Sequence, residues 1–240
     1  MKGIARVLLL AFAVASSRQT ATSAFSWCAA PLRLDSGSLA LAVLPDAHSM
    51  FESAEQALDQ GYAPECLSRL EGVVPPRALR VFVEDSRYRQ VVEDCVETWN
   101  HDLGDVFTVV DSAQDADIVV VWQPVLRMGD ADIAGYASWT RSADGLTGTI
   151  QLRTQAPNGR PMNDRQVRHA ALHELGHLLG LADGGRAGEV MAPLNMRRPA
   201  ANPSDREVDA LLQWREQIDA VRSQALTELA NRTGGYPKRS

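Results

Sequence analysis

The chain has 240 residues, of which 45% are hydrophobic and 22% are charged, and these values are typical of a globular protein with a real core. This length provides room for one sizeable domain and a smaller appendage. The formal net charge of −6 gives no electrostatic support for binding nucleic acid or an anionic membrane surface, so neither is expected as a partner.

The chain begins with the features of a secretory signal peptide, predicted to span residues 1–24. Two basic residues precede an uncharged apolar run at 7–15, which is too short to cross a bilayer as a helix. Small residues follow, and cleavage after either Ala15 or Ala24 fits them. We therefore expect a secreted protein, extracellular or periplasmic, with no membrane attachment in its mature form. A retained N-terminal anchor is the alternative.

Residues 25–76 are predicted to form an N-terminal helical segment or pro-region. Two short amphipathic helices are expected within 48–74, and consecutive prolines at 75 and 76 mark a domain boundary. The segment is interpreted either as a pro-segment or helical cap that covers a cleft, or as a packing appendage or interaction arm. Cys28 and Cys66 can form a disulfide in an exported chain, whereas Cys95 lies on an apolar helix face and is predicted to be a core residue.

Residues 77–233 are predicted to form the main domain, and 234–240 a tail. Strands are expected at 78–84, 106–110, 117–123, 133–141 and 147–153, and helices at 87–103, at 164–179 and from 204 onward. The near-continuous apolar run at 117–123 is typical of a strand buried on both faces, whereas 133–141 alternates like an exposed strand. This order predicts an α/β (α+β) fold class, in which helices pack on a sheet.

The sequence His-Glu-Leu-Gly-His occupies residues 173–177, within a predicted helix. Residues four apart lie on one helix face, so His173 and His177 can bind one metal ion, and zinc suits neutral imidazole nitrogens. Zinc lowers the pKa of a bound water toward about 7, and the carboxylate of Glu174 can take its proton during attack on a carbonyl. The pattern therefore indicates a metal-assisted hydrolase with Glu174 as general base. His169, one turn earlier, is too far from such a metal and is interpreted as an outer-sphere or surface residue.

A catalytic zinc ion usually has a third protein ligand and one open coordination position. Gly180 can adopt a positive φ and end the helix sharply, so that the returning chain brings Asp183 to the metal. Two alternatives remain open. Asp183 can instead cap backbone amides in a loop, and Glu207 on the last helix can supply the third ligand in a different zinc-hydrolase fold.

Residues 173–183 resemble the metzincin zinc signature, H-E-x-x-H-x-x-G-x-x-H, with Asp183 in place of the last histidine. The sequence Val-Met-Ala-Pro at 190–193 resembles the methionine turn of matrix metalloproteases (matrixins), and 204–208 resembles the start of their C-terminal helix. The likeness extends from residue 77 to about 215 in the order of elements. It implies a metzincin-like catalytic domain with a mixed twisted sheet, one antiparallel edge strand, a zinc helix and a C-terminal helix.

The same resemblance implies roles for other residues. Met191 would form an apolar floor beneath the metal, and the strand at 133–141 would pair with an extended peptide substrate. Tyr136 and Trp139 in that strand are interpreted either as core residues or as part of a substrate groove.

Three features depart from the matrixin pattern. The third ligand position holds Asp183 and not histidine, as in some bacterial metzincins such as the snapalysin-like ones. No histidine lies between 102 and 168, so the second, structural zinc of matrixins is not expected. Neither Cys28 nor Cys66 lies in the Pro-Arg-Cys-Gly motif with which matrixin pro-segments cap the zinc. One catalytic zinc is therefore predicted, and no motif identifies a calcium site.

The sequence as a whole predicts a secreted zinc-dependent metalloendopeptidase acting on protein or peptide substrates. Its predicted ligands are His173, His177 and Asp183, with Glu174 as the base that later donates a proton to the leaving amine. The alternative is a catalytically inactive zinc-containing binding or inhibitory module. The intact Glu174 argues against it, because an inactive site has no use for the base.

Overall fold

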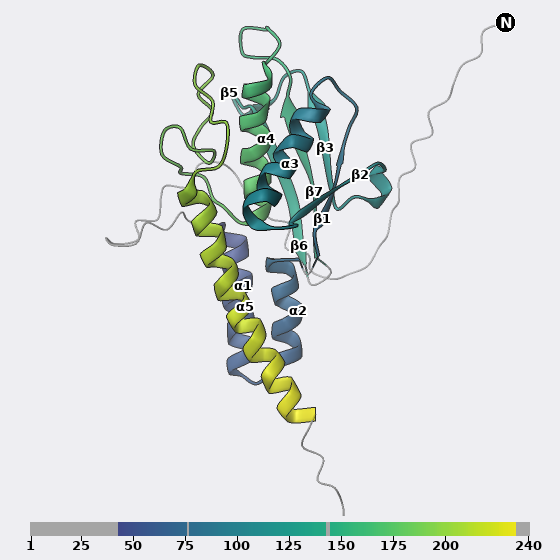
Figure 1. Ribbon diagram of the computed structural model, residues 1–240, viewed down its shortest axis with the longest axis vertical. Coiled ribbons are helices and arrows are strands. Elements are labelled where there is room, and N and C mark those ends of the chain that lie inside the picture. The colour runs from purple at the N-terminus through teal and green to yellow at the C-terminus, as the bar shows by residue number, and fades with distance from the viewer. Residues whose placement is uncertain (1–42, 76, 143–144, 234–240) are drawn as a thin grey trace, which may run out of the picture.

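The main sheet occupies the upper part of the molecule, and a group of helices lies below it (Figure 1). The computed structural model describes residues 43–75, 77–142 and 145–233. The predicted signal peptide, Cys28 and the predicted tail lie outside these residues. No helix of the described residues is long and apolar enough to span a membrane.

The sheet has five strands in the order β2-β1-β3-β7-β6. Their bounds are β1 Leu79–Val83, β2 Phe107–Val110, β3 Ile118–Gln123, β6 Gly135–Ser142 and β7 Gly145–Arg153. Strands β2, β1, β3 and β7 run parallel, and only β6, at the edge, pairs antiparallel with its neighbour β7. The predicted mixed sheet with one antiparallel edge strand is confirmed. A short hairpin precedes β6; its strands, β4 (Arg127–Met128) and β5 (Ala131–Asp132), have two residues each. The single-turn helix η1 (Ala113–Asp115) precedes β3.

Helices α3 (Arg89–Leu103) and α4 (Asp164–Leu179) pack against each other and against the sheet (Figure 1). Their contact contains the fully buried Trp99, whose indole N–H donates to the carbonyl of Leu172 at 3.2 Å. Cys95 is also fully buried in this core, as predicted. This packing fixes α4, the helix that carries the His-Glu-Leu-Gly-His sequence, against the sheet.

Strand β3 is more exposed than its apolar sequence predicts. Ile118 and Val120 are buried, whereas Val119 and Val121, on the other side of the strand, are only partly buried. The expectation of burial on both faces is therefore wrong. The physical reason is that α3 and α4 pack together and so cover the same side of the sheet.

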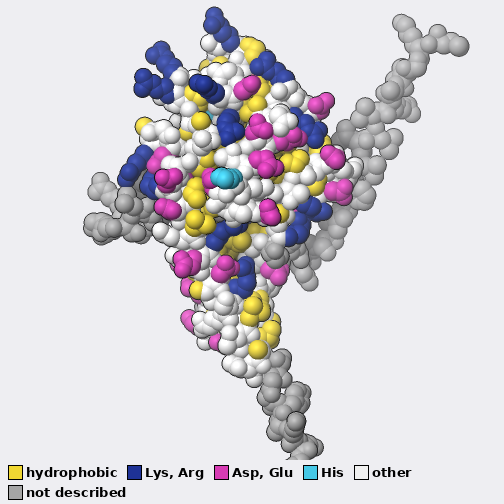
Figure 2. Space-filling model, in the orientation of Figure 1, with side chains coloured by type: hydrophobic (Ala, Val, Ile, Leu, Met, Phe, Trp, Pro, Cys, Tyr) yellow, Lys and Arg dark blue, Asp and Glu magenta, His cyan; other side chains and the backbone are white. Residues whose placement is uncertain are grey.

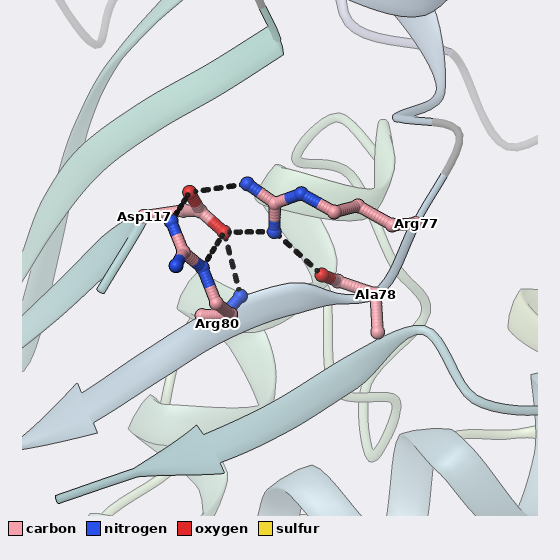
Figure 3. Close-up of polar contacts among 4 residues, drawn as sticks. All are labelled: Arg77, Ala78, Arg80 and Asp117. Atoms are coloured by element: carbon pink, nitrogen blue, oxygen red, sulfur yellow. Dashed lines mark hydrogen bonds and ion pairs between the residues drawn. The ribbon is translucent and has the colours of Figure 1, made fainter. Parts of the chain in front are cut away.

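A buried carboxylate links the starts of β1 and β3 (Figure 3). Asp117 receives two hydrogen bonds from the guanidinium of Arg77, at 2.7 and 2.8 Å, and one from the backbone N–H of Arg80 at 2.8 Å. Burial alone would raise the pKa of Asp117, but the hydrogen bonds from Arg77 and Arg80 outweigh it and hold that pKa well below its usual range. Asp117 therefore remains ionised and keeps the two strands in register.

The N-terminal helices form a second core with the C-terminal helix. Helix α1 (Pro45–Asp59) and helix α2 (Ala63–Val73) pack beside α5 (Asp205–Thr233), as Figure 1 shows below the sheet. Phe51 meets the indole of Trp214 edge-on with ring centroids 4.9 Å apart, and Ile218 and Ala225 extend this core along α5. The two predicted N-terminal helices are present, and their hydrophobic faces are covered by the last helix of the main domain.

Arg141, on β6, connects this helical layer to the sheet. Its guanidinium lies 3.2 Å from the carboxylate of Asp46 and donates to the carbonyl of Val73 at 3.1 Å, at the end of α2. It also donates to the carbonyl of Leu178 at 3.1 Å, at the end of α4. With 2% of its side chain exposed, Arg141 satisfies carbonyl groups at two helix ends that otherwise lack intrahelical partners.

Candidate metal centre

Both ends of α4 are defined by local sequence. Asn163 begins the helix with a capping box. Its side chain accepts a hydrogen bond from the backbone N–H of Gln166, and the Gln166 side chain accepts one from the backbone N–H of Asn163. Gly180 ends it with φ of 111°, a left-handed conformation that suits glycine because it has no Cβ. The left-handed turn at Gly180 agrees with the sequence prediction and directs the chain back toward the helix.

The two histidines of α4 are oriented by backbone carbonyl groups. Nδ1 of His173 lies 2.8 Å from the carbonyl oxygen of Val190, and Nδ1 of His177 lies 2.8 Å from that of Leu181. A carbonyl oxygen only accepts hydrogen bonds, so each Nδ1 carries the proton and each neutral ring presents a lone pair at Nε2. This is the tautomer in which Nε2 can bind a metal ion.

Asp183 joins the two histidines. Its Oδ1 lies 3.1 Å from Nε2 of His173 and 3.6 Å from Nε2 of His177, and the two Nε2 atoms are 3.1 Å apart. Ligand atoms of a tetrahedral zinc site, with bonds of about 2.0–2.1 Å, lie about 3.3 Å from one another. Two neutral imidazoles in this tautomer cannot hydrogen-bond to each other through Nε2. The donor set therefore fits a zinc ion in both geometry and chemistry.

Glu174 lies beside this group and is almost entirely buried. It is 4% exposed, and burial raises the pKa of its carboxyl to about 7. The backbone N–H of Ala137 on β6 donates to the carboxylate. Gly135, two residues earlier, lets the strand come this close, because a Cβ there would lie 2.4 Å from Oε1 of Glu174. The edge strand thus positions the predicted base.

Burial acts differently on the two histidines. Burial, together with the neighbouring His173, lowers the pKa of His177 to about 4. For His173, burial also favours the neutral ring, but the adjacent carboxylates of Asp183 and Glu174 outweigh it and raise the pKa. The site therefore collects carboxylates around buried imidazoles, a charge distribution that favours a bound cation.

The turn at 190–193 packs against this group. Met191 is fully buried, and its Sδ would lie 2.7 Å from a Cβ at Gly176. The turn therefore lies directly against α4, at a residue between His173 and His177. Glu207, the alternative third ligand, holds this turn instead. Its carboxylate accepts from the backbone N–H of Met191 and from that of Ser204, both at 2.7 Å.

This role of Glu207 was not recognised in the sequence, although the Ser-x-x-Glu spacing at 204–207 is that of a capping box. Among the described residues, His173, His177 and Asp183 are the one group of three potential ligands that lie together. Neither a second zinc site nor a calcium site of that kind is found in these parts of the chain.

Three further residues near the site can now be placed. His169 is buried, not at the surface; its Nδ1 accepts from the N–H of Ala200 at 2.9 Å, so it ties α4 to a later loop. Trp139 stacks on His177 with centroids 6.2 Å apart, and its indole N–H donates to Asp46 of α1 at 2.7 Å. Tyr136 lines a pocket of about 270 Å³ that also contacts His173 and Glu174.

No protein-family model matches this chain, and no curated protein matches it. Among solved structures, the crystal structure of archaemetzincin from Methanopyrus kandleri is similar, with a TM-score of 0.42 and 16% sequence identity. The match covers 58% of this chain and 96% of that chain. Similarity at this level does not bear on activity, metal content or substrate, and the matrixin-like subtype stays a prediction.

Proposed function

We propose that this chain is an exported zinc-dependent metalloendopeptidase. The observation that supports the proposal best is the placement of three ligand atoms, from His173, His177 and Asp183, at separations of 3.1 to 3.6 Å beside a buried carboxylate. A zinc ion held there would polarise a substrate carbonyl and acidify a water molecule. The single aspartate ligand would make that acidification weaker than three neutral histidines do.

Glu174 is the proposed general base. Its raised pKa, about 7, suits a group that takes a proton from the attacking water and later gives it to the leaving amine. The N–H of Ala137 holds the carboxylate against the edge strand, so the proton-transfer group has one position. In this proposal His169 and Glu207 act only as supports, through the loop and the methionine turn that they fix.

The edge strand β6 is the proposed binding site for the peptide backbone. Ala134 accepts from the N–H of Arg153 on β7, so in this antiparallel pair the odd-numbered residues of β6 direct their N–H and C=O groups away from the sheet. Gly135 thus presents its N–H and C=O groups to a peptide, and Ala137 its C=O group, because the N–H of Ala137 donates to Glu174. An extended peptide can add there as a further strand.

The decisive experiment compares metal content and peptidase activity in three proteins. The wild type should contain about one zinc per chain by elemental analysis. Glu174→Ala should keep the zinc and lose at least about 100-fold in activity on a peptide library. Asp183→Ala should weaken zinc binding by more than about tenfold. Loss of a residue that merely supports a metal ligand already costs about that much, so loss of a ligand should cost more.

Full activity of Glu174→Ala would refute the mechanism, and unchanged zinc affinity in Asp183→Ala would place the third ligand elsewhere. A wild type that binds zinc but cleaves no peptide would favour an inactive binding module. Export is tested separately, by the N-terminal sequence of protein recovered from the medium or periplasm. Recovery of uncleaved protein only from the cytoplasm would contradict it.

A further inference from the structure

The pocket beside Glu174 and His173 has two kinds of lining. Apolar side chains form most of its surface, including those of Met128, Ile133, Met162, Leu194 and Met196. Arg153 and Asp132 supply polar groups. At about 270 Å³ it is just below the range of about 300–1,000 Å³ that holds a drug-sized ligand, so it suits one amino-acid side chain.

Arg153 is the polar group that distinguishes this pocket. It is 5% exposed, and its Nη1 lies 3.0 Å from Oδ1 of Asp132. The same oxygen lies 3.3 Å from Nε of Arg127, so one carboxylate is shared by two guanidinium groups. Nε of Arg153 is buried and has no hydrogen-bond partner among the described residues. A buried donor of this kind is unfavourable until an acceptor reaches it.

The loops that border the pocket carry excess positive charge. The three segments 127–134, 154–165 and 193–198 contain five arginines and three aspartates, a net charge of +2, in a chain whose total is −6. All five arginines are exposed: Arg127, Arg160, Arg165, Arg197 and Arg198. Figure 2 shows basic side chains gathered at the upper end of the molecule, where Figure 1 places the loops around the start of α4. The surroundings of the pocket therefore attract an anionic ligand.

We propose that this pocket binds the side chain of a substrate glutamate, with Arg153 as the residue that determines this specificity. The methylene groups would contact the apolar walls, and the carboxylate would accept from Nε of Arg153. In the proposed mechanism Glu174 gives its proton to the amine that leaves when the peptide bond breaks. Glu174 also lines this pocket, so the substrate residue whose nitrogen becomes that amine lies next to the pocket. The preferred glutamate is thus directly C-terminal to the scissile bond. This inference rests on the proposed peptidase function.

The test uses zinc-loaded protein and three peptides that differ only in having Glu, Gln or Leu at that position. We expect kcat/KM of the wild type to be roughly 10- to 100-fold higher for the Glu peptide than for the Leu peptide, the effect of one charge-assisted hydrogen bond. Arg153→Met should remove this preference, so that the variant cleaves the Glu and Leu peptides with similar kcat/KM. Arg127→Met is the matched control, because Arg127 contacts the same Asp132 but does not line the pocket.

A second measurement does not depend on turnover. Tripeptides that begin with Glu or Leu represent the leaving product, and calorimetry should show Arg153-dependent preference for the Glu tripeptide. Binding with this preference but no cleavage would overturn the peptidase function and leave the pocket assignment standing. Cleavage without preference for Glu would overturn the pocket assignment alone, and so would equal binding of the two tripeptides. The wild-type comparisons decide the matter even if Arg153→Met fails to fold.

Discussion

At the scale of single residues, Glu174 owes its position to the missing side chain at residue 135. A Cβ there would lie 2.4 Å from Oε1 and 2.7 Å from Cγ of Glu174, and the buried carboxylate has little space to withdraw. Gly135→Ala should therefore displace the base and lower kcat at least about tenfold, since general-base catalysis contributes about 10²–10⁴. Zinc content should not change, because the ligands lie on other elements. Steady-state kinetics and elemental analysis measure both quantities.

Ser138→Ala is the control for that substitution, because residue 138 is an exposed position on the same strand. It should have the kinetics of the wild type. Normal kcat in Gly135→Ala would show that Glu174 does not need its observed position, and loss of zinc would show that the substitution disturbs the whole site.

The sequence revealed those site residues whose relations are local. His173, His177, the turn at Gly180 and Asp183 lie within eleven positions, so helix periodicity and glycine conformation suffice to bring them together. The contact of Glu207 with Met191 was not predictable in this way, because a loop of 16 positions separates them. The burial of Arg153 was also hidden, since an arginine at the end of a strand is usually exposed.

At the scale of elements, the carboxylate between β1 and β3 should make stability depend on pH. The folded-state pKa of Asp117 is depressed, so its contribution is fully present above the unfolded pKa of about 4 and is lost as pH falls below that value. Asp117→Asn should lower the free energy of unfolding by about 1.5–3 kcal/mol at pH 7. The difference from the wild type should shrink in urea unfolding experiments at progressively lower pH.

Asp115→Asn serves as the comparison, because Asp115 is exposed and lies only two residues earlier, at the end of η1. It should change the free energy of unfolding by no more than about 0.5 kcal/mol. An equal loss in both variants, or a loss in Asp117→Asn that does not depend on pH, would rule out the proposed contribution of the Arg77–Asp117–Arg80 cluster.

Most helices and strands followed from periodicity, and the exceptions have clear causes. The helix predicted at 164–179 has those bounds in the structure because a capping residue and a glycine define its ends. The hairpin of β4 and β5 was missed, since two-residue strands carry no periodic pattern. The exposed side of β3 was misjudged because a run of apolar residues does not reveal on how many faces helices will pack.

At the scale of the whole molecule, residues 43–73 are expected to act as a permanent support and not as a removable pro-segment. Removing them would expose Trp214 and Ile218, which are 5% and 1% exposed in the intact chain. It would also remove Asp46, the partner of Arg141. A chain without this segment should melt at least about 10 °C lower, because each large apolar side chain contributes about 1.5–3 kcal/mol when buried.

Calorimetry and peptidase assays of the shortened and full chains test this expectation. Activity should fall together with stability. A shortened chain that is equally stable and more active would instead establish that the segment keeps the enzyme latent, which is the other interpretation of residues 25–76.

The packing of α1 and α2 against α5 also means that this core is completed only late in synthesis of the chain. The first two helices leave the ribosome early, yet the apolar residues that cover them, Trp214, Ile218 and Ala225, are translated near the end. Arg141 and α4 are translated between these two groups, and in the finished structure Arg141 joins the end of α4 to Asp46 of α1. Glu207, which holds the turn at Met191 beside the candidate metal ligands, is also translated after α4. We therefore expect the proposed peptidase site to be complete only once the start of α5 has been made and has docked.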